Sequence, residues 1–439
     1  MFKATAQAVM ASLMVATPAI VNAAGFAVVE QNGSRLGTAY AGGAAEASDA
    51  SVLLSNPAGM VHLVGRQLSI SGVAFLPKIE FTNDNSMSAA GTPMSGANGG
   101  NAAKTSFIPN LYFVDSLGNG MKYGLSVTAP AGVKIKNGSD WVGRYFSSES
   151  MLEVVDISPA FAANVGSGTA IGVALNIQYA RAKQAKAIDF GTACYGIAPA
   201  AFCGSQGLFP QGADGMAEVN GHDWSAGYHV GIQHDLTPHT RLGLMYRSKV
   251  AHKIDGATAF SKVPAFLADG FQGTRTQAEI TLPEVISLSA VHKATSALTL
   301  MGDASWTRWS RFNELRIHFD TPPLTGDDIT TEAWRNSWRF AFGTEYRYSG
   351  DLTLRAGIAR DQSPIVNGFR TPAIPDSSRN SLAFGIGYKV SKTGSLDLGY
   401  THLFIAKGDV NLSSPSQGNL KGRYNNTADV LGVQYNVAF

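Results

Sequence analysis

The chain has 439 residues, of which 45% are hydrophobic, 15% are charged and 48 are glycine. Its formal net charge of +2 gives no reason to expect a nucleic-acid partner. After the first 23 residues no run of about 18 consecutive apolar residues occurs, so no membrane-spanning helix is predicted. Two classes remain: a transmembrane β-barrel, whose strands alternate apolar and polar residues, and a secreted soluble β protein.

The first 23 residues have the organisation of a signal peptide. Lys3 supplies a positive charge, residues 6–20 are mostly apolar, and residues 21–23 (VNA) suit recognition by a signal peptidase. We therefore predict cleavage after Ala23 and export of the chain. A buried or membrane helix is the alternative, which Pro18 and the shortness of the apolar run disfavour.

Residues 24–65 have few large apolar side chains and many glycines, and such a segment cannot form a core of its own. We predict that it is a hatch, that is, irregular backbone held inside a larger structure that supplies its hydrogen-bond partners. The sequence Asn56-Pro57-Ala58 favours a tight turn near the end of this segment. Two interpretations of this turn stay open: a structural corner, or part of a gate that moves.

The C-terminal end of the chain alternates most clearly between apolar and other residues. Leu431, Val433, Tyr435, Val437 and Phe439 fall on one face of a strand, and smaller or polar residues fall on the other. Similar alternation occurs over residues 171–180, 338–348, 352–359 and 382–389. The second face is rich in Gly and Ala, whereas the outer face of a soluble sandwich would carry more charge. We therefore predict an all-β fold, with a transmembrane β-barrel over residues 66–439.

Short and long connections alternate along this barrel region. Six short turns are predicted, at residues 118–120, 166–168, 237–239, 294–296, 349–350 and 392–394. Seven long loops are predicted, at about residues 78–103, 131–148, 182–222, 256–273, 321–333, 364–378 and 408–427. Six turns and seven loops make thirteen connections and therefore fourteen antiparallel strands. The short turns should lie at the periplasmic rim and the long loops outside the cell.

Several short motifs, taken in order, resemble those of the FadL family of outer-membrane transporters for long-chain fatty acids and other hydrophobic compounds. They are AGF at 24–26, GTAYAG at 37–42, SNPA at 55–58, WVGRY at 141–145, YRSK at 246–249, LPE at 282–284, WTRWS at 306–310 and IPDSSR at 374–379. The resemblance extends over nearly the whole mature chain. It implies a fourteen-stranded barrel in the outer membrane of a Gram-negative bacterium, a lumen blocked by an N-terminal hatch, and uptake by passive diffusion.

The resemblance also implies a lateral exit through the barrel wall. Family members have an inward kink in the third strand, which opens a gap beside it. In this chain that strand contains Pro130, which cannot donate a ladder hydrogen bond, and Gly132, which tolerates unusual backbone angles. One expectation is a kink at Pro130 and Gly132; the other is that Pro130 ends the strand at the outer rim.

The third and fourth long loops are expected to capture the ligand, because they form a hydrophobic groove in the family. Large apolar residues are rarely kept on exposed loops without a ligand or partner. Those expected to bind ligand are Phe202, Leu208, Phe209, Phe260, Val263, Phe266, Leu267 and Phe271. The spacing of the last five also suits one face of a short helix. The alternative is that the two loops pack only on each other.

Cys194 and Cys203 are the only cysteines, and both lie in the third long loop. In an exported protein we expect them to form a structural disulfide. A metal site would need further Cys or His residues close by, and none lies between them. No metal and no cofactor is therefore predicted.

An anionic head group would need a positive partner inside the barrel. The resemblance places Phe26 in an inner pocket, beside the free α-amino group of Ala24. Alternation assigns four further cations to the lumen: Arg339, Arg347, Arg355 and Lys389. Their alternative role is to pair with carboxylates such as Glu345 or with the hatch.

No enzyme motif is present in the sequence: Gly-x-Ser-x-Gly, P-loop and His-Glu-x-x-His patterns are missing. We therefore predict a monomeric transporter, not an enzyme, that binds a long-chain fatty acid or another hydrophobic molecule. Its other partners should be outer-membrane lipid and lipopolysaccharide, with no nucleic acid. Three alternatives stay open: an outer-membrane lipase, a plugged barrel for aromatic hydrocarbons, and a general diffusion porin without hatch or apolar outer loops.

Overall fold

The computed structural model describes residues 25–320 and 326–439, so the predicted signal peptide over residues 1–23 lies outside the described residues. The strands are β1 (Gln67–Asn83), β2 (Ser106–Gly118), β3 (Met121–Lys136), β4 (Glu149–Gly166), β5 (Thr169–Asp189), β6 (Asp214–Thr237), β7 (Thr240–Arg247), β8 (Val250–Ser261), β9 (Thr274–Leu282), β10 (Val285–Lys293), β11 (Leu298–Thr307), β12 (Glu314–Phe319), β13 (Gly326–Thr331), β14 (Ser337–Arg347), β15 (Leu352–Asp361), β16 (Arg379–Lys389), β17 (Gly394–Ile405), β18 (Gly408–Ser414) and β19 (Gly418–Ala438). The helices are α2 (Gly33–Leu36), α3 (Val52–Ser55), η1 (Pro57–His62), α4 (Phe190–Ile197), α5 (Ala200–Ser205), η2 (Ala265–Gly270) and η3 (Trp309–Arg311).

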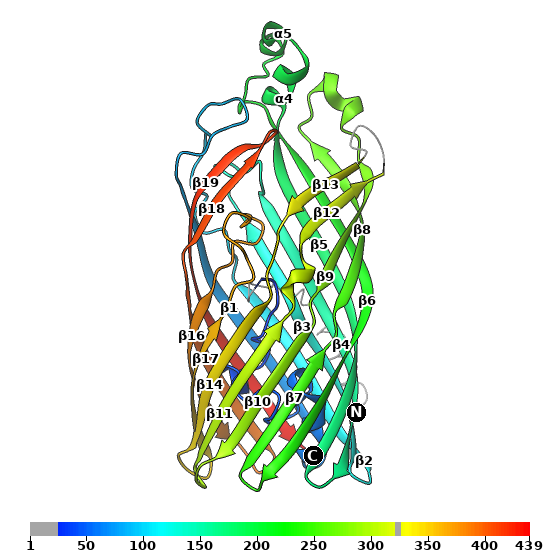
Figure 1. The fold of residues 1–439 in the computed structure, drawn as a ribbon, viewed down its shortest axis with the longest axis vertical. Coiled ribbons are helices and arrows are strands. Elements are labelled where there is room, and N and C mark those ends of the chain that lie inside the picture. Colours follow the sequence, from blue (N-terminus) through cyan, green and yellow to red (C-terminus); the bar gives the residue numbers. More distant parts are fainter. Residues whose placement is uncertain (1–24, 321–325) are drawn as a thin grey trace.

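The strands form one closed antiparallel barrel, in which the last strand, β19, pairs with the first, β1, along the full length of β1 (Figure 1). Five barrel strands are interrupted once, so that each consists of two consecutive pieces: β7 with β8, β9 with β10, β11 with β12, β13 with β14, and β17 with β18. Pro283, which has no N–H group to donate, stands in one of these interruptions, between β9 and β10. Nineteen pieces less five give fourteen barrel strands, which confirms the predicted fold.

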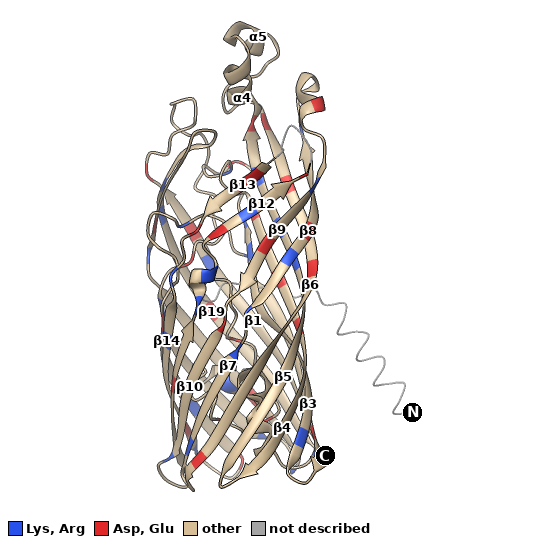
Figure 2. Cartoon of the chain, turned by 45° about the vertical axis from the view of Figure 1, so that its right-hand side comes forward, with Lys and Arg blue, Asp and Glu red and all other residues tan. Residues whose placement is uncertain are grey.

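The two faces of the wall differ as the alternation predicted. On the outer face Phe342 is 53% exposed and Ile358 is 56% exposed, whereas Gln434 on the inner face is fully buried. Figure 2 shows few charged residues on the lower part of the strands and more of them toward the upper end. The lower part is therefore the apolar band that faces lipid. No helix within the described residues combines the length and apolar character needed to cross a membrane.

Several predicted loops are wrong in extent, because the strands continue beyond the apolar band. Both ends of the loop predicted over residues 182–222 are strand, since β5 continues to Asp189 and β6 begins at Asp214. The loop predicted over residues 408–427 is a hairpin of β18 and β19. Above the membrane both faces of a strand meet water, so the apolar alternation is lost while the backbone ladder continues.

The N-terminal segment lies inside the lower half of the barrel (blue in Figure 1). It forms three short helices, α2, α3 and η1, separated by turns, and β1 follows at Gln67. Leu36, Leu53 and Met60 are at most 1% exposed. Helix α2 contacts β16, β17 and β19, and η1 contacts β4, β5 and β6 on the opposite side of the lumen. The hatch therefore spans the interior from wall to wall.

Glycines of the wall stand where the hatch backbone comes closest. A Cβ atom at Gly231 of β6 would overlap the side chain of Asn56, and one at Gly243 of β7 would overlap the carbonyl of Ala44. The absence of a side chain at these positions lets hatch and wall touch directly. Part of the high glycine content is thus explained by the packing of hatch against barrel.

We expect Gly231→Val to displace Asn56 and loosen the hatch, with a loss of stability of about 1–3 kcal/mol from overpacking. Liposomes containing this variant should admit small sugars faster than liposomes with the wild type in a swelling assay. Gly302→Val on β11 is the matched control, because a Cβ atom there has nothing within 4 Å. Equal permeability of the two variants would contradict this account of the wall glycines.

Candidate functional site

The outer mouth of the barrel encloses a vestibule of about 780 Å³. Its wall is formed by the upper ends of β5, β6, β8, β12 and β13 and by residues 368–373 and 411–417. Apolar side chains in the wall include Phe146, Ile188, Phe260, Phe271 and Phe369. The vestibule is large enough for a drug-sized or lipid-sized ligand.

A smaller inner cavity of about 80 Å³ continues inward from the vestibule. Six residues line both spaces and form what we call the neck: Gln184, Val219, Leu315, Ile317, Glu332 and Ala373. Phe26 of the hatch lines the inner cavity but not the vestibule. The two spaces therefore adjoin at the neck, and Phe26 stands at the inner one.

Phe26 is held in an aromatic cluster and is 1% exposed. Its ring centroid lies 4.8 Å from that of Trp309, 5.3 Å from Phe312 and 5.4 Å from Trp334. Edge-to-face pairs of this kind are worth about 0.5–1.5 kcal/mol beyond the burial of their area. The cluster closes the inner cavity on the side of the hatch.

Glu332 lies in the connection between β13 and β14, on the extracellular side of the apolar band. Trp334 Nε1 donates a hydrogen bond of 3.0 Å to Glu332 Oε2, and Thr371 Oγ1 donates one of 3.5 Å to Oε1. Burial raises the pKa of the Glu332 carboxyl to about 8, although both hydrogen bonds act in the opposite direction.

The third strand, β3, leaves its neighbour β2 part-way up the wall. The ladder between them ends at the pair Leu111↔Val127, whereas β3 itself continues to Lys136 and pairs with β4 across a register shift between Thr128 and Ala131. Pro130 lies inside this shift. The expectation that Pro130 ends the strand is therefore wrong, and above Val127 one edge of β3 has no partner in β2.

The first residues of the hatch occupy this open edge. Val28 N donates to Pro130 O over 2.9 Å, Gly132 N donates to Phe26 O over 2.7 Å, and Ala27 forms an antiparallel bridge with Ala131. The hatch thus adds a short strand beside β3 at the position of the predicted kink. The backbone of Phe26 holds this edge while its side chain closes the inner cavity.

A third cavity, of about 200 Å³, lies between the hatch and the wall. Ala27, Pro130 and Trp309 line it together with Arg247 and Arg339. Because Trp309 contacts Phe26, the aromatic cluster separates this hatch-side cavity from the inner cavity. The cavity adjoins the bulge of β3.

The predicted corner at Asn56-Pro57-Ala58 is firmly attached to its surroundings. Asn56 is fully buried, and its Nδ2 donates to Ala44 O (2.7 Å) and to Ile232 O of the wall (3.1 Å). Its Oδ1 accepts from Ala58 N over 3.0 Å at the start of η1. These contacts suit a structural corner; movement of the corner stays a prediction.

The four predicted lumen cations do not share one environment. Arg355 pairs with Glu345 (2.9 Å) and Asp397 (2.5 Å), and Arg339 donates to the hatch carbonyl Ala39 O (2.5 Å). Arg347 and Lys389 are exposed residues near the short turns. Only Arg339 lines a described cavity between hatch and wall. Residue 24, whose α-amino group was predicted beside Phe26, lies outside the described residues.

The predicted capture residues fall into two groups. Phe260 and Phe271 line the vestibule and contact each other at 5.4 Å, and Phe190 adds a further contact with Phe271 at 4.9 Å. Phe202 of α5 and Phe266 of η2 pair at 5.6 Å and are both partly exposed above the rim. The single helix face predicted from residue 260 onward is wrong, because Phe260 belongs to β8 and only Ala265–Gly270 form a short 3₁₀-helix.

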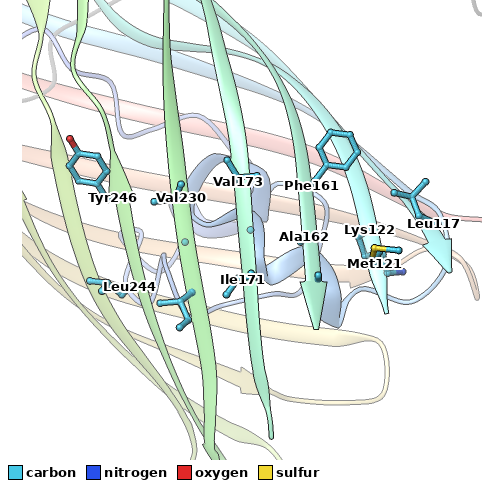
Figure 3. Close-up of a pocket in the computed structure, with 14 residues that line it drawn as sticks. Leu117, Met121, Lys122, Phe161, Ala162, Ile171, Val173, Val230, Leu244 and Tyr246 are labelled. Carbon is cyan, nitrogen blue, oxygen red and sulfur yellow. The ribbon is translucent and has the colours of Figure 1, made fainter. Parts of the chain in front are cut away.

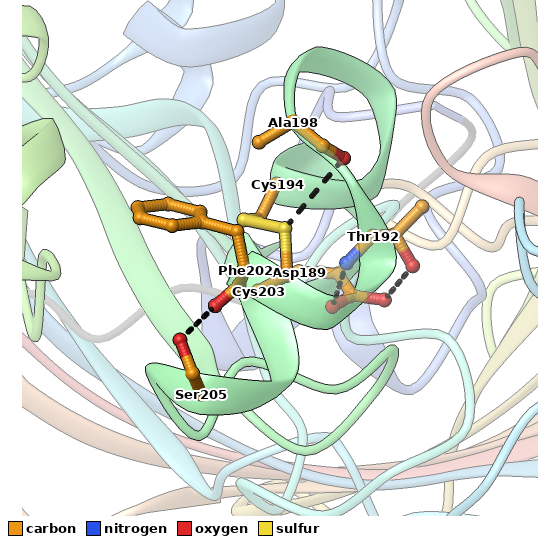
Figure 4. The surroundings of a disulfide bond; sticks show 7 residues. All are labelled: Asp189, Thr192, Cys194, Ala198, Phe202, Cys203 and Ser205. Atoms are coloured by element: carbon orange, nitrogen blue, oxygen red, sulfur yellow. Dashed lines mark hydrogen bonds between the residues drawn. A yellow bond between two sulfur atoms is a disulfide. The ribbon is translucent and has the colours of Figure 1, made fainter.

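The remaining predicted capture residues do not line the vestibule: Leu208, Phe209, Val263 and Leu267. Leu208 is buried against Cys194 and Cys203, which form a disulfide between α4 and α5 (Figure 4). Asp189 starts α4 by accepting a hydrogen bond from Thr192 N over 2.9 Å. The cysteines therefore fix the shape of the loop that carries Phe202.

Another hollow, of about 540 Å³, lies on the outer wall near the short turns (Figure 3). Its rim includes Phe161, Val173 and Leu244, which belong to the exposed apolar face. Gly172 and Gly231 line it where the corner of the hatch touches the inside of the wall. This hollow belongs to the lipid-facing surface and does not connect to the vestibule.

Sequence reasoning missed four residues of the inner site: Trp309, Phe312, Glu332 and Trp334. They lie in strand interruptions, where no alternation marks a face. The only available signal was a local excess of aromatic residues, with three tryptophans and one phenylalanine at positions 306, 309, 312 and 334. Within the described residues, no group of three or more His, Cys, Asp or Glu side chains is placed to hold a metal ion.

The profile of the family described as outer membrane protein transport protein (OMPP1/FadL/TodX) matches residues 13–439. The chain belongs to this family. It is 31% identical to a protein of Neisseria meningitidis serogroup B over 96% of each chain. It is also 28% identical to the long-chain fatty acid transport protein of Escherichia coli K12, over 95% of this chain and 94% of that one.

Solved structures show the same fold. A crystal structure of a Pseudomonas aeruginosa FadL homologue matches with a TM-score of 0.86 at 23% identity, over 95% of this chain and 100% of that one. The toluene transporter TodX of Pseudomonas putida matches with a TM-score of 0.69 at 16% identity, over 95% of this chain and 100% of that one. As a member of the OMPP1/FadL/TodX family, the chain is an outer-membrane transport protein of a Gram-negative bacterium.

We expect the double variant Cys194→Ser/Cys203→Ser to lose the fixed shape of the α4–α5 loop while the barrel stays folded. Closing a loop of this size contributes about 2–3 kcal/mol in the chain-entropy description. Limited proteolysis should cut within residues 190–209 of the variant much faster than in the wild type, and the barrel should keep its heat-resistant gel mobility. Equal cutting rates would show that packing of Leu208 alone holds the loop.

Proposed function

We propose that this protein takes up long-chain fatty acids or related hydrophobic molecules across the outer membrane by passive diffusion. The observation that carries the proposal is the series of cavities that leads from the vestibule, past the neck and Phe26, to the hatch-side cavity beside Pro130. Fatty-acid transport by relatives of similar length supports the choice of ligand. The path lies within one barrel, so a monomer is sufficient.

Capture takes place at the outer mouth. Phe202 and Phe266 meet above the rim, and Phe260 and Phe271 continue the apolar surface into the vestibule. A ligand that leaves lipopolysaccharide or water gains about 0.8 kcal/mol for each buried methylene. The two loops contact each other and also offer apolar surface, so packing and capture do not exclude one another.

The ligand has to move side chains in order to go further. The inner cavity holds about 80 Å³, whereas ligand pockets usually measure about 300–1,000 Å³. Only one end of a fatty acid fits while Phe26 keeps its place among Trp309, Phe312 and Trp334. Entry of more of the chain requires that Phe26 swings out of the cluster.

Displacement of Phe26 would release the edge of β3. Two backbone hydrogen bonds hold the hatch there, and each contributes about 0.5–1.5 kcal/mol, so together they oppose opening by about 1–3 kcal/mol. Burial of about four methylenes yields a similar amount. A long-chain ligand has further methylenes to offset the ring contacts that Phe26 also loses, so its binding opens the gap beside β3 and the ligand leaves sideways into the membrane lipid.

A plugged barrel for aromatic hydrocarbons is the second candidate. The aromatic walls around Phe26 suit a small aromatic ligand, and the fold is shared with the toluene transporter TodX. A general diffusion porin is disfavoured, because α2 and η1 contact opposite walls of the lumen. Uptake of labelled oleate and of labelled toluene by the same cells compares the two ligand classes.

We expect a disulfide between Ala27→Cys and Ala131→Cys to block uptake. These residues face each other in an antiparallel bridge, where Cα atoms lie about 4.5–5.5 Å apart, a distance that suits a disulfide. In cells without another transporter, the oxidised variant should take up labelled oleate at least about tenfold more slowly. The reason is that each ~1.4 kcal/mol by which the disulfide stabilises the closed state lowers the population of the open state by a factor of about ten. A reductant should restore uptake.

The controls separate the gate from the function. The single variant Ala27→Cys should behave like the wild type, and the wild type with reductant tests the effect of opening Cys194–Cys203. Full uptake by the oxidised double variant would refute lateral release beside β3 and leave hydrophobic uptake standing. No difference between cells with and without the wild-type protein, for oleate and toluene alike, would refute the function itself.

A further inference from the structure

The neck between the vestibule and the inner cavity contains a single ionisable side chain. Of the six residues that line both spaces, three are branched aliphatic residues, one is Gln184 and one is Ala373. The sixth is Glu332, which is 2% exposed. A ligand that moves from the vestibule to Phe26 has to pass its carboxyl group. The position of Glu332 on this route is the first observation.

The hydrogen-bond partners of Glu332 are neutral. Trp334 Nε1 and Thr371 Oγ1 donate to its two oxygens, and no ion pair among the described residues includes it. The segment 321–325 between β12 and β13 reads TPPLT and contains no ionisable side chain. A charge on Glu332 is therefore not neutralised by a neighbouring cation of the described part of the chain.

Several charged groups on the elements around the neck have partners of their own. Lys183 of β5 lies 3.0 Å from Glu218 and 3.4 Å from Glu149. Lys186 of β5 pairs with Asp328 of β13, and on β12 Arg316 pairs with Glu314 and Asp327 while His318 pairs with Asp327. Beside η3, Arg308 and Arg311 both pair with Glu284. Arg370, in the 362–378 connection, donates a hydrogen bond to the carbonyl oxygen of Asp376. Among the described residues that line the vestibule and the inner cavity, both cations, Lys183 and Lys186, therefore have carboxylate partners.

We propose that Glu332 is a charge filter at the neck: while its carboxyl group is neutral, carboxylate and uncharged ligands both reach Phe26, and once it is ionised it excludes carboxylates alone. A neutral carboxyl donates a hydrogen bond to a ligand carboxylate, whereas two carboxylates in a confined apolar neck repel each other. The raised pKa of Glu332 supports the idea, since its charge then changes near neutral pH. This inference rests on the proposed function, because it concerns which ligands pass.

The test compares decanoate with 1-decanol, two ligands of equal chain length of which only the first is charged. Binding to the purified full-length protein is followed by the change in intrinsic tryptophan fluorescence, because two of the six tryptophans, Trp309 and Trp334, contact Phe26. Both measurements are made at about pH 6.5 and about pH 9, where the ligand carboxyl is ionised, since carboxyl groups titrate near pH 4–5.

We expect the wild type to bind decanoate about tenfold more weakly at the higher pH. With a pKa of about 8, only about one Glu332 carboxyl in ten is still neutral at about pH 9, and repulsion between like charges about 5 Å apart excludes decanoate from the ionised form. Decanol should bind with the same affinity at both pH values. Glu332→Gln keeps an acceptor for Trp334 Nε1 but cannot ionise, so its decanoate affinity should not depend on pH. Decanol binding by this variant checks that the site is folded. Glu314→Gln, which changes a carboxylate on β12 outside the neck, is the matched control and should behave like the wild type.

The outcomes that would overturn the filter are distinct. A decanoate affinity that falls equally with pH in the wild type and in Glu332→Gln would assign the titration to another group, such as a free α-amino group, whose ordinary pKa is about 8. Decanoate binding without pH dependence in the wild type would refute the filter alone. Failure of the wild type to bind either ligand at either pH would refute the proposed function together with the filter.

Discussion

The lumen of a fourteen-stranded barrel has to be filled by backbone whose polar groups find partners, and this requirement shapes both hatch and wall. Wall side chains meet it: His229 reaches Leu53 O at 3.0 Å, and Arg247 donates to Leu54 O over 2.8 Å. From the hatch, Asn56 donates to the wall carbonyl of Ile232. Several inward polar residues of the wall are therefore partners of the hatch.

The same requirement links the hatch to the wall gap. Once β3 separates from β2, its free edge needs donors and acceptors, and Phe26 and Val28 supply them. The ring of Phe26 thus closes the inner cavity, while its carbonyl oxygen accepts a hydrogen bond from Gly132 N at the free edge of β3. On the proposed path, a ligand that displaces the ring would act directly on the backbone that covers this edge of β3, so no long-range coupling between two separate sites would be needed.

The sequence was sufficient for the parts of the fold that repeat. Apolar residues at every second position, such as Leu431, Val433 and Tyr435, predict which face of a strand meets lipid. The alternation of short turns and long loops predicts the number of strands. It was insufficient where repetition stops. The outer ends of β5 and β6 lose the apolar face without losing the ladder, and Glu332 and Trp334 stand in an interruption without periodicity. Trp334 contacts Phe26, and Glu332 lines the same cavity as Phe26, which is distant in the chain and which only the folded hatch brings beside them.

On the proposed path, charge is distributed in a definite order. In the vestibule and inner cavity the lysines are paired with carboxylates, and the neck carries the lone carboxyl of Glu332. Beyond the aromatic cluster, the hatch-side cavity contains Arg339, which donates a hydrogen bond to the neutral carbonyl of Ala39, although Asp303 and Asp361 line the same space. An anionic head group is therefore disfavoured at the neck once Glu332 is ionised, and it meets Arg339 only beyond Phe26. This order favours a ligand that enters with its apolar end first, because that end can displace Phe26 while the head group is still in the vestibule.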